Sequence, residues 1–197
     1  MGEKIKTAIE IAMEKAARIG ELSPEEKEKI ENKEKLKPIM AEFYKGKLSP
    51  NDLWQRLKGS KLSLLVETQL NLINSLRLEN PQAELQKRKK GILALETLKK
   101  DQNTSMIELN LNLIEDLQRR AKEEKERAYN NLKANIEKNP QARMREVKQG
   151  QATIVMRLSA DEAAKQSPQW KQFLLEHERR YSQEFAKIVE KLKVELK

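Results

Sequence analysis

The chain contains no cysteine, one histidine and few aromatic residues, which make up 4% of its 197 residues. The absence of cysteine excludes disulfides, thiolate metal sites and cysteine nucleophiles, and it leaves the redox compartment undetermined. The few glycines are scattered, so the chain has neither a glycine-rich phosphate loop nor a nucleophile elbow. We therefore expect a protein that is not an enzyme, holds no cofactor or metal and has no small-molecule substrate.

Targeting and membrane signals are also missing. No apolar run approaches the length of about 18 residues that a membrane-spanning helix needs. The residues after Met1 lack the apolar core of a signal peptide, and Lys6 stands where the myristoylation pattern requires serine or threonine. From this we expect a cytoplasmic location.

Charge is what the chain has in abundance, at 36% of its residues with a net charge of +9. Glutamate greatly outnumbers aspartate, and glutamate, lysine and leucine favour helices where aspartate does not. The composition therefore predicts a mainly α protein whose core consists of seams between helices. The basic balance permits contact with nucleic acid or an anionic membrane, although the excess is not concentrated in one patch.

The most informative stretch is 103–139, which contains no proline or glycine before Pro140. Its first part is densely apolar and its second part, residues 118–138, is almost entirely charged. Asn103 or Thr104 can cap its start, and Asn139 followed by Pro140 can end it. A helix of roughly 35 residues would be about 50 Å long, which exceeds the width of a domain of this size. We expect part of it to project or to meet a partner.

The whole chain is predicted to form an antiparallel helical bundle of α-hairpins, with this long projecting helix and a small two-stranded β-hairpin. We divide it into 1–47 (N-terminal helices and a charged connector), 48–139 (a duplicated α-hairpin body with the long helix), 140–159 (the β-hairpin) and 160–197 (C-terminal amphipathic helices).

Region 1–47 predicts three helices. An alanine- and isoleucine-rich stripe spans 3–19, and Ser23 to Glu26 form a capping box with proline at the first helical position. The helix that this box opens carries few apolar residues and reads as a solvated connector. Pro38 is expected to start a separate short helix that ends at Gly46.

The central region contains an internal repeat. Residues 67–76 align with 108–117 at an offset of 41 positions, with six identities. We predict a duplicated α-hairpin whose equivalent helices pack against each other. Glu67 and Glu108, with Asn71 and Asn112 one turn later, would then form a buried polar layer that sets the register. A di-iron site would need histidine at this spacing, and none is present.

Residues 142–158 favour strands, with Gln149 to Gln151 as a turn. A three-residue loop would collect the apolar side chains on one face and Arg143, Arg145 and Arg157 on the other. A lone hairpin of two strands is marginal, so we expect its apolar face to dock on helices or on another copy.

The last helix carries an apolar stripe at spacings of three and four. This C-terminal stripe consists of Trp170, Leu174, His177, Tyr181, Phe185, Ile188 and Leu192. It is long enough to pair with 3–19, with the long helix or with its own copy in a dimer. Because His177 lies on the stripe, we expect it to be hydrogen-bonded within a helix seam rather than to bind a metal.

Two basic groups are candidate anion sites: the run Lys87, Arg88, Lys89 and Lys90, and the hairpin arginines Arg143, Arg145 and Arg157. Neither has aromatic residues nearby for base stacking, so only sequence-nonspecific phosphate contact would be expected. Our favoured prediction is a helical interaction or scaffold protein that self-associates or binds a helical partner. The alternative is a module that binds RNA or DNA phosphates.

Overall fold

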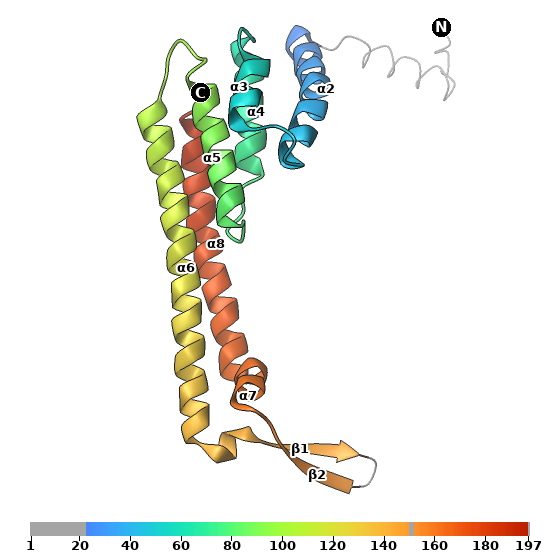
Figure 1. Cartoon of the computed structure of the whole chain (residues 1–197), viewed down its shortest axis with the longest axis vertical. Helices are drawn as coiled ribbons and strands as arrows, with labels where there is room; N and C mark the ends of the chain where they lie inside the picture. The colour runs from blue at the N-terminus through green and yellow to red at the C-terminus, as the bar shows by residue number, and fades with distance from the viewer. Residues whose placement is uncertain (1–22, 150–151, 197) are drawn as a thin grey trace, which may run out of the picture.

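The computed structural model describes residues 23–149 and 152–196, and these are mainly helical (Figure 1). In chain order they form α2 (Pro24–Tyr44), α3 (Pro50–Leu57), α4 (Leu62–Asn74), α5 (Gln82–Glu96), α6 (Thr104–Lys138), the 3-10 turn η1 (Pro140–Arg143), β1 (Met144–Gln149), β2 (Ala152–Arg157), α7 (Ala160–Gln166) and α8 (Pro168–Val194). The predicted fold class is confirmed. The stripe predicted over 3–19 lies outside the described residues.

Helix α6 begins and ends where the sequence predicts. Its 35 residues start after Asn103 and stop before Pro140. No proline or glycine interrupts it, and its buried residues between Ile107 and Leu117 lie on one face. The early part of α6 is therefore held by packing, while its charged remainder continues beyond the shorter helices α2 to α5.

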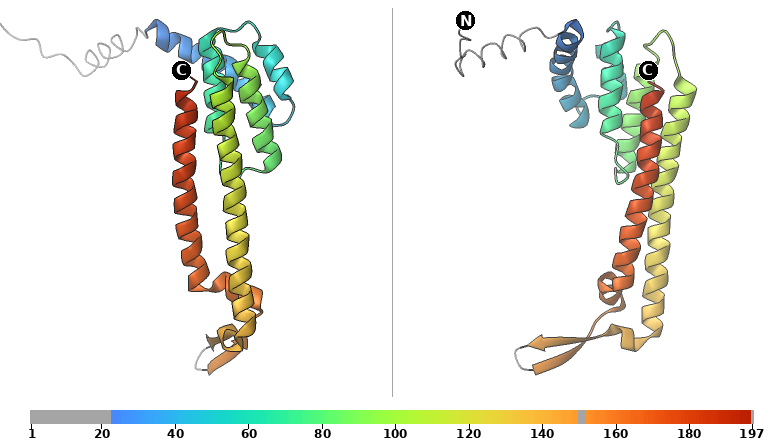
Figure 2. Two further views of the ribbon diagram at one scale, coloured as in Figure 1. Left: turned by 90° about the vertical axis from the view of Figure 1, so that its left-hand side faces the viewer. Right: turned by 180° about the vertical axis from the view of Figure 1, so that it is seen from behind.

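The molecule has a wide end and a narrow end (Figures 1 and 2). We call the wide end the head: helices α2 to α5 with residues 104–117 of α6, residues 182–194 of α8 and the two residues that follow α8. The narrow end, called the stalk, consists of residues 118–138 of α6 and 160–181 of α7 and α8, which run side by side. The predicted projection of the long helix is confirmed, but α8 accompanies it in antiparallel orientation.

The main hydrophobic core fills the head, where every helix contributes to it, and it continues into the stalk as far as Ala121 and Tyr181. Leu53, Leu72 and Ile92 are fully buried there. Glycine inside a helix costs about 1 kcal/mol relative to alanine, and Gly91 in α5 is explained by close packing. A Cβ atom at Gly91 would lie 3.3 Å from both Leu72 Cδ1 and Phe43 Cζ.

A second, smaller core lies at the far end of the stalk. Ile136 of α6 packs there with three buried alanines of α7, Ala160, Ala163 and Ala164. Ser159 caps α7 through a reciprocal capping box with Glu162. The short alanine-rich helix thereby closes the end of the α6–α8 pair.

One prediction about the head is wrong, and a second holds only in part. Pro38 does not start a new helix but lies inside α2, because Leu36, Met40 and Phe43 bury one continuous face on both sides of it. This packing outweighs the lost backbone hydrogen bond. The equivalent helices of the repeat also behave unequally: α3 packs closely on α5, whereas α4 is not closely packed on α6.

Candidate functional site

The C-terminal stripe is used inside the chain, along the seam with α6. Leu174 and Phe185 are partly buried. The other members are buried: Trp170, His177, Tyr181, Ile188 and Leu192. Of the three pairing partners predicted for this stripe, the long helix is the one that occupies it in the described structure.

An aromatic ladder fills the stalk part of this seam. Trp170 stacks on Phe173 with a centroid distance of 5.2 Å and an interplanar angle of 12°, and Tyr129 of α6 lies 5.1 Å from Trp170. His177 follows, 4.6 Å from the ring of Tyr181. Such ring pairs stabilise beyond their buried area.

His177 is hydrogen-bonded in the seam, as predicted. Its Nε2–H donates to the carbonyl oxygen of Ala121 at 2.9 Å, and 9% of the residue remains exposed. The hydrogen bond fixes the tautomer with the proton on Nε2. Within the described residues, no group of three or more histidine, aspartate or glutamate residues is arranged to hold a metal ion.

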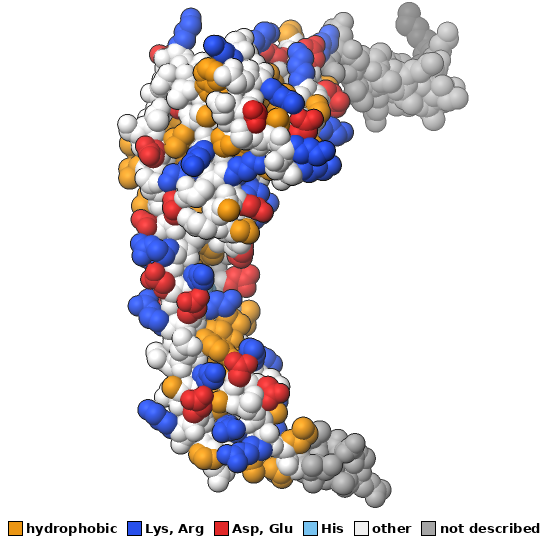
Figure 3. Space-filling view, in the orientation of Figure 1, with side chains coloured by type: hydrophobic (Ala, Val, Ile, Leu, Met, Phe, Trp, Pro, Cys, Tyr) orange, Lys and Arg blue, Asp and Glu red, His pale blue; other side chains and the backbone are white. Residues whose placement is uncertain are grey.

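Charged pairs border the ladder. Glu124 of α6 accepts hydrogen bonds from Arg180 and, at 2.7 Å, from the Tyr181 hydroxyl. The Arg180 hydrogen bond is the main cause that holds the pKa of Glu124 below its ordinary value. Arg120 and Glu184 form a further pair at 2.7 Å. Positive and negative side chains are therefore interspersed on the stalk surface (Figure 3).

The basic run on α5 does not form a free patch. Lys87 donates to the carbonyl of Phe43 and lies over its ring. Arg88 pairs with Glu84 at 2.7 Å, and Lys89 pairs with Glu115 at 3.0 Å. Lys90 is exposed. Lys87 and Lys89 thus connect α5 to other helices of the head, whereas the ion pair of Arg88 lies within α5.

The hairpin arginines do not share one face. The strands pair Met144 with Arg157 and Arg145 with Met156, with two residues connecting Gln149 to Ala152. Since directly opposite residues share a face, Arg145 and Arg157 lie on opposite faces. The predicted three-residue loop is wrong because neither face packs closely on a described helix, so no core imposes an apolar face.

Two of these arginines also bind backbone oxygens of their own chain. Arg143 Nε donates to the carbonyl of Leu158 at 3.0 Å, and Arg145 reaches the carbonyl of Gln166 at 3.4 Å. Arg145 and Arg157 remain exposed. The hairpin therefore carries exposed cations without a concentrated phosphate-binding face.

The predicted polar layer is absent from the described structure. Asn71 donates to the carbonyl of Glu67 within its own helix, and the exposed Asn112 accepts from Lys89. Glu108 is exposed. The layer fails because α4 and α6 do not pack closely.

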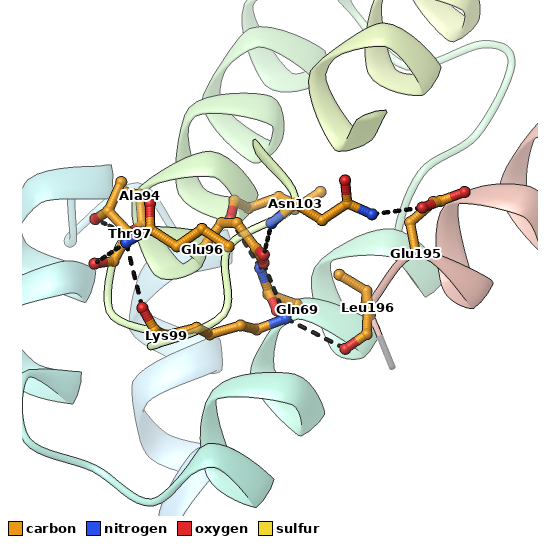
Figure 4. Close-up of polar contacts among 10 residues, drawn as sticks. Gln69, Ala94, Glu96, Thr97, Lys99, Asn103, Glu195 and Leu196 are labelled. Carbon is orange, nitrogen blue, oxygen red and sulfur yellow. Dashed lines mark hydrogen bonds and ion pairs between the residues drawn. The ribbon is translucent and has the colours of Figure 1, made fainter. Parts of the chain in front are cut away.

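A different buried polar cluster lies where α4, α5 and the end of α8 meet (Figure 4). Glu96 is 1% exposed and forms an ion pair with Lys99 at 2.9 Å. It also accepts from Gln69 Nε2 and from the backbone N–H of Asn103, both at 2.8 Å. Lys99 donates in addition to the carbonyl of Leu196 at 3.3 Å, which fastens the end of α8 to the head.

Burial alone would raise the pKa of Glu96, and this is the largest single effect. The hydrogen bonds from Asn103, Gln69 and Lys99 together outweigh it and lower the pKa below its ordinary value of 4.5. Glu96 is therefore a charged structural anchor. Sequence reasoning missed it because a Glu–Lys pair three residues apart is usual on an exposed helix face.

One open cleft of about 1230 Å³ lies where the α4–α5 turn meets α6 and α8. Its lining mixes acidic and basic side chains, and several are paired: Asp116 with Arg119, and Glu115 with Lys89 outside the lining. The hydrogen bond from Lys89 is the main cause that lowers the pKa of Glu115. Every described carboxylate whose pKa departs clearly from its ordinary value has that pKa lowered, which is the opposite of what a general acid requires.

Exposed apolar side chains gather at two other places. Met144, Val155 and Met156 of the hairpin are each at least half exposed. Met106, Leu109 and Leu113 form a second group, the outer α6 stripe, at spacings of three and four along the head. Sequence patterns predicted the apolar content of both segments, but not that these side chains remain uncovered.

Comparisons with protein-family models, with curated proteins and with solved structures gave no match. Among the residues that the structure describes, no helix has the length and apolar content needed to cross a membrane.

Proposed function

We propose that this chain is a non-enzymatic helical scaffold protein that holds two protein-binding surfaces apart. One surface is the β-hairpin, and the other is the outer α6 stripe on the head. The observation that carries the proposal is the placement of an uncovered hairpin at the end of a two-helix stalk (Figure 1). At 1.5 Å per residue, α6 spans about 50 Å, so partners at the two ends would not collide.

The hairpin is the stronger of the two candidate surfaces. Isolated hairpins of two strands are marginal in water, and those that persist pack on a further element. Here the strands pack on each other while no described helix packs closely on them. Met144 and Val155 expose 51% and 54% of their surfaces. A partner that covers these side chains would stabilise the hairpin and gain apolar burial.

Self-association is supported less strongly. The C-terminal stripe is occupied within the chain, which leaves the outer α6 stripe as the candidate dimer surface. Its three apolar side chains, Met106, Leu109 and Leu113, are few compared with the interface of a stable dimer. We therefore expect weak, concentration-dependent association that a Leu109→Glu substitution abolishes, measured by sedimentation velocity.

Site-specific photocrosslinking in the native cell tests the scaffold proposal. A photoreactive residue replaces Val155 in the hairpin, Leu109 in the outer α6 stripe or, as a control, the exposed Asn131 on the stalk. We expect discrete protein crosslinks from Val155 and Leu109, with different partners, and none above background from Asn131. Crosslinks from neither surface, or equal crosslinks from all three positions, would contradict the scaffold function.

The alternative function, binding of nucleic-acid phosphates, rests on the exposed Lys90, Arg145 and Arg157. These residues belong to separate elements or faces, so they would act as separate weak contacts. A binding assay with RNA and duplex DNA at several salt concentrations tests it. Tight binding with a steep salt dependence, lost on changing Arg145 and Arg157 to glutamate, would favour this function over the scaffold.

A further inference from the structure

The ladder between β1 and β2 determines which backbone groups remain free. Leu158 N–H donates to the carbonyl of Arg143 at 2.8 Å, and the same register continues through the strands. In an antiparallel pair, hydrogen-bonded and non-hydrogen-bonded residue pairs alternate. The N–H and C=O groups of Thr153, Val155 and Arg157 therefore point away from β1. No other described strand pairs with them, so in the described structure they form a free edge along β2.

The two edges of the hairpin differ in charge. Strand β1 contains Arg145, Glu146 and Lys148, whereas β2 contains no charged residue from Ala152 to Met156. Charged residues, lysine above all, protect an edge strand from pairing with another chain. The β1 edge carries charges at Glu146 and Lys148, whereas the β2 edge carries one only at its end, at Arg157. An added strand would therefore pair with β2.

Charge also indicates the chemistry of that strand. Residues 138–157 contain five basic residues and one acidic residue, Glu146. A second copy would bring the same positive excess against the first and be repelled. A nucleic acid would need a concentrated cationic face, but Arg145 and Arg157 lie on opposite faces. An acidic polypeptide in extended conformation would be attracted by the positive charge, and its backbone could form hydrogen bonds with the edge of β2.

We propose that the free edge of β2 binds an extended segment of a partner protein in which acidic and β-branched residues alternate. The segment adds as a third strand, and its backbone pairs with Thr153, Val155 and Arg157. Because successive side chains of a strand alternate between faces, its apolar side chains lie on the Val155 face, where they cover the exposed Val155. This inference rests on the proposed scaffold function and specifies what the hairpin surface recognises.

The test uses the full chain and two synthetic peptides of about ten residues, a length that matches one strand plus flanks. One alternates valine with glutamate, and the other alternates valine with lysine. Fluorescence anisotropy measures binding, and NMR hydrogen exchange follows single amides. We expect the acidic peptide to bind about tenfold or more tightly than the basic one. We also expect it to slow exchange at Thr153 and Val155 but not at Glu146 and Lys148.

Proline substitutions give a matched pair of variants. Val155 and Glu146 are directly opposite each other, so Val155→Pro and Glu146→Pro each remove one outward N–H, from opposite edges. Val155→Pro should weaken binding of the acidic peptide about tenfold. Glu146→Pro should not weaken it, and Val155→Ala, which keeps the N–H but loses part of the apolar contact, should weaken it less than Val155→Pro does. Circular dichroism checks that the helices are retained.

Each contrary outcome overturns the inference in a recognisable way. Equal weakening by both proline variants, or weakening by Glu146→Pro alone, would show that the β2 edge is not the binding edge. Equal binding of polyglutamate or single-stranded DNA would show attraction by charge alone. A concentration-dependent dimer that Val155→Pro dissociates would identify a second copy as the occupant. Failure of the acidic peptide to bind, with protein crosslinks from position 155 retained, would remove strand addition and leave the scaffold function standing.

Discussion

The head and the stalk are built from the same two long helices but are stabilised differently. In the head, α6 and α8 are covered by further helices, and aliphatic side chains such as Leu53, Leu72 and Ile92 are fully buried. In the stalk the two helices pack on each other and, at the far end, on the short helix α7, so a larger part of each faces water. The seam there relies on aromatic rings in contact, one buried histidine and paired charges along its borders. A pair of helices can thus extend beyond the main core when aromatic side chains fill the seam between them and no further helices cover it.

The chain offers a separate fluorescent probe for each region. Trp54 lies in the head, where its indole N–H donates to Thr97 at 3.1 Å, and Trp170 lies in the stalk ladder. Trp170→Phe leaves a reporter of the head, and Trp54→Phe leaves a reporter of the stalk. Urea unfolding followed in these two backgrounds compares the regions directly.

The largest effect is expected from breaking the buried ion pair of the head. Lys99→Met leaves the Glu96 carboxylate buried without its cation, which should lower the free energy of unfolding by about 3 kcal/mol near neutral pH. The change should appear in both tryptophan reporters, because Lys99 also holds the end of α8 through the carbonyl of Leu196. Urea unfolding measures it.

The pH dependence of this variant follows from the sign of the Glu96 shift. In the native protein the pKa of Glu96 is lowered, so its charge stabilises the fold above about pH 4.5, and this contribution is lost as the pH falls through the lowered pKa. In Lys99→Met the buried charge is a cost, so its effect should shrink on acidification towards pH 4.5, where Glu96 can become neutral. If Lys99→Met lowered the free energy of unfolding equally near neutral pH and near pH 4.5, the buried-charge explanation would be contradicted. Adding Glu96→Gln to Lys99→Met should restore part of the lost free energy of unfolding.

A core truncation in the head is expected to come next. Leu72 is fully buried and packs closely on Gly91. Leu72→Ala should therefore lower the free energy of unfolding by about 3 kcal/mol. Because the stalk helices are anchored in this core, both reporters should shift to lower urea. The half-buried Leu174 of the stalk is the matched control, and Leu174→Ala should cost about 1 kcal/mol. Equal losses at the two sites would mean that the head is no better packed than the stalk.

The sequence was sufficient for the elements that depend on local signals. The capping box at Ser23 and the stop at Pro140 mark helix ends through contacts within a few residues. The length of α6 followed from the lack of breakers, and its projection followed from that length. The seam position of His177 followed from its place in the apolar period.

What could not be predicted depends on contacts between distant segments. Pro38 is tolerated because buried neighbours hold α2 together on both sides of it. In the sequence, Lys87 to Lys89 look like a run of solvent-exposed cations. In the structure, their partners come from other helices or from the preceding turn of α5. The hairpin register was predicted on the assumption that a core covers one face, and no described helix does so.

A smaller effect, confined to the stalk, is expected from Tyr181→Phe. The substitution keeps the ring that stacks near His177 and removes only the hydroxyl that donates to Glu124. One hydrogen bond to a charged acceptor contributes about 1 to 2 kcal/mol, so the stalk reporter should shift and the head reporter should change little. Shifts of equal size in both reporters would show that the two regions unfold as one unit.

The smallest effect is expected at the border of the seam. Arg120 and Glu184 approach to 2.7 Å, but both side chains are exposed, so the pair gains little over its interaction with water. Arg120→Gln should lower the free energy of unfolding by about 0.5 kcal/mol or less, and raising the salt concentration should remove the difference. Arg119→Gln, on the neighbouring exposed position that pairs only within α6, is the control that subtracts the effect of losing one positive charge. If Arg120→Gln costs as much as Tyr181→Phe and the cost persists in high salt, then the charged border, and not the aromatic ladder, holds the stalk together.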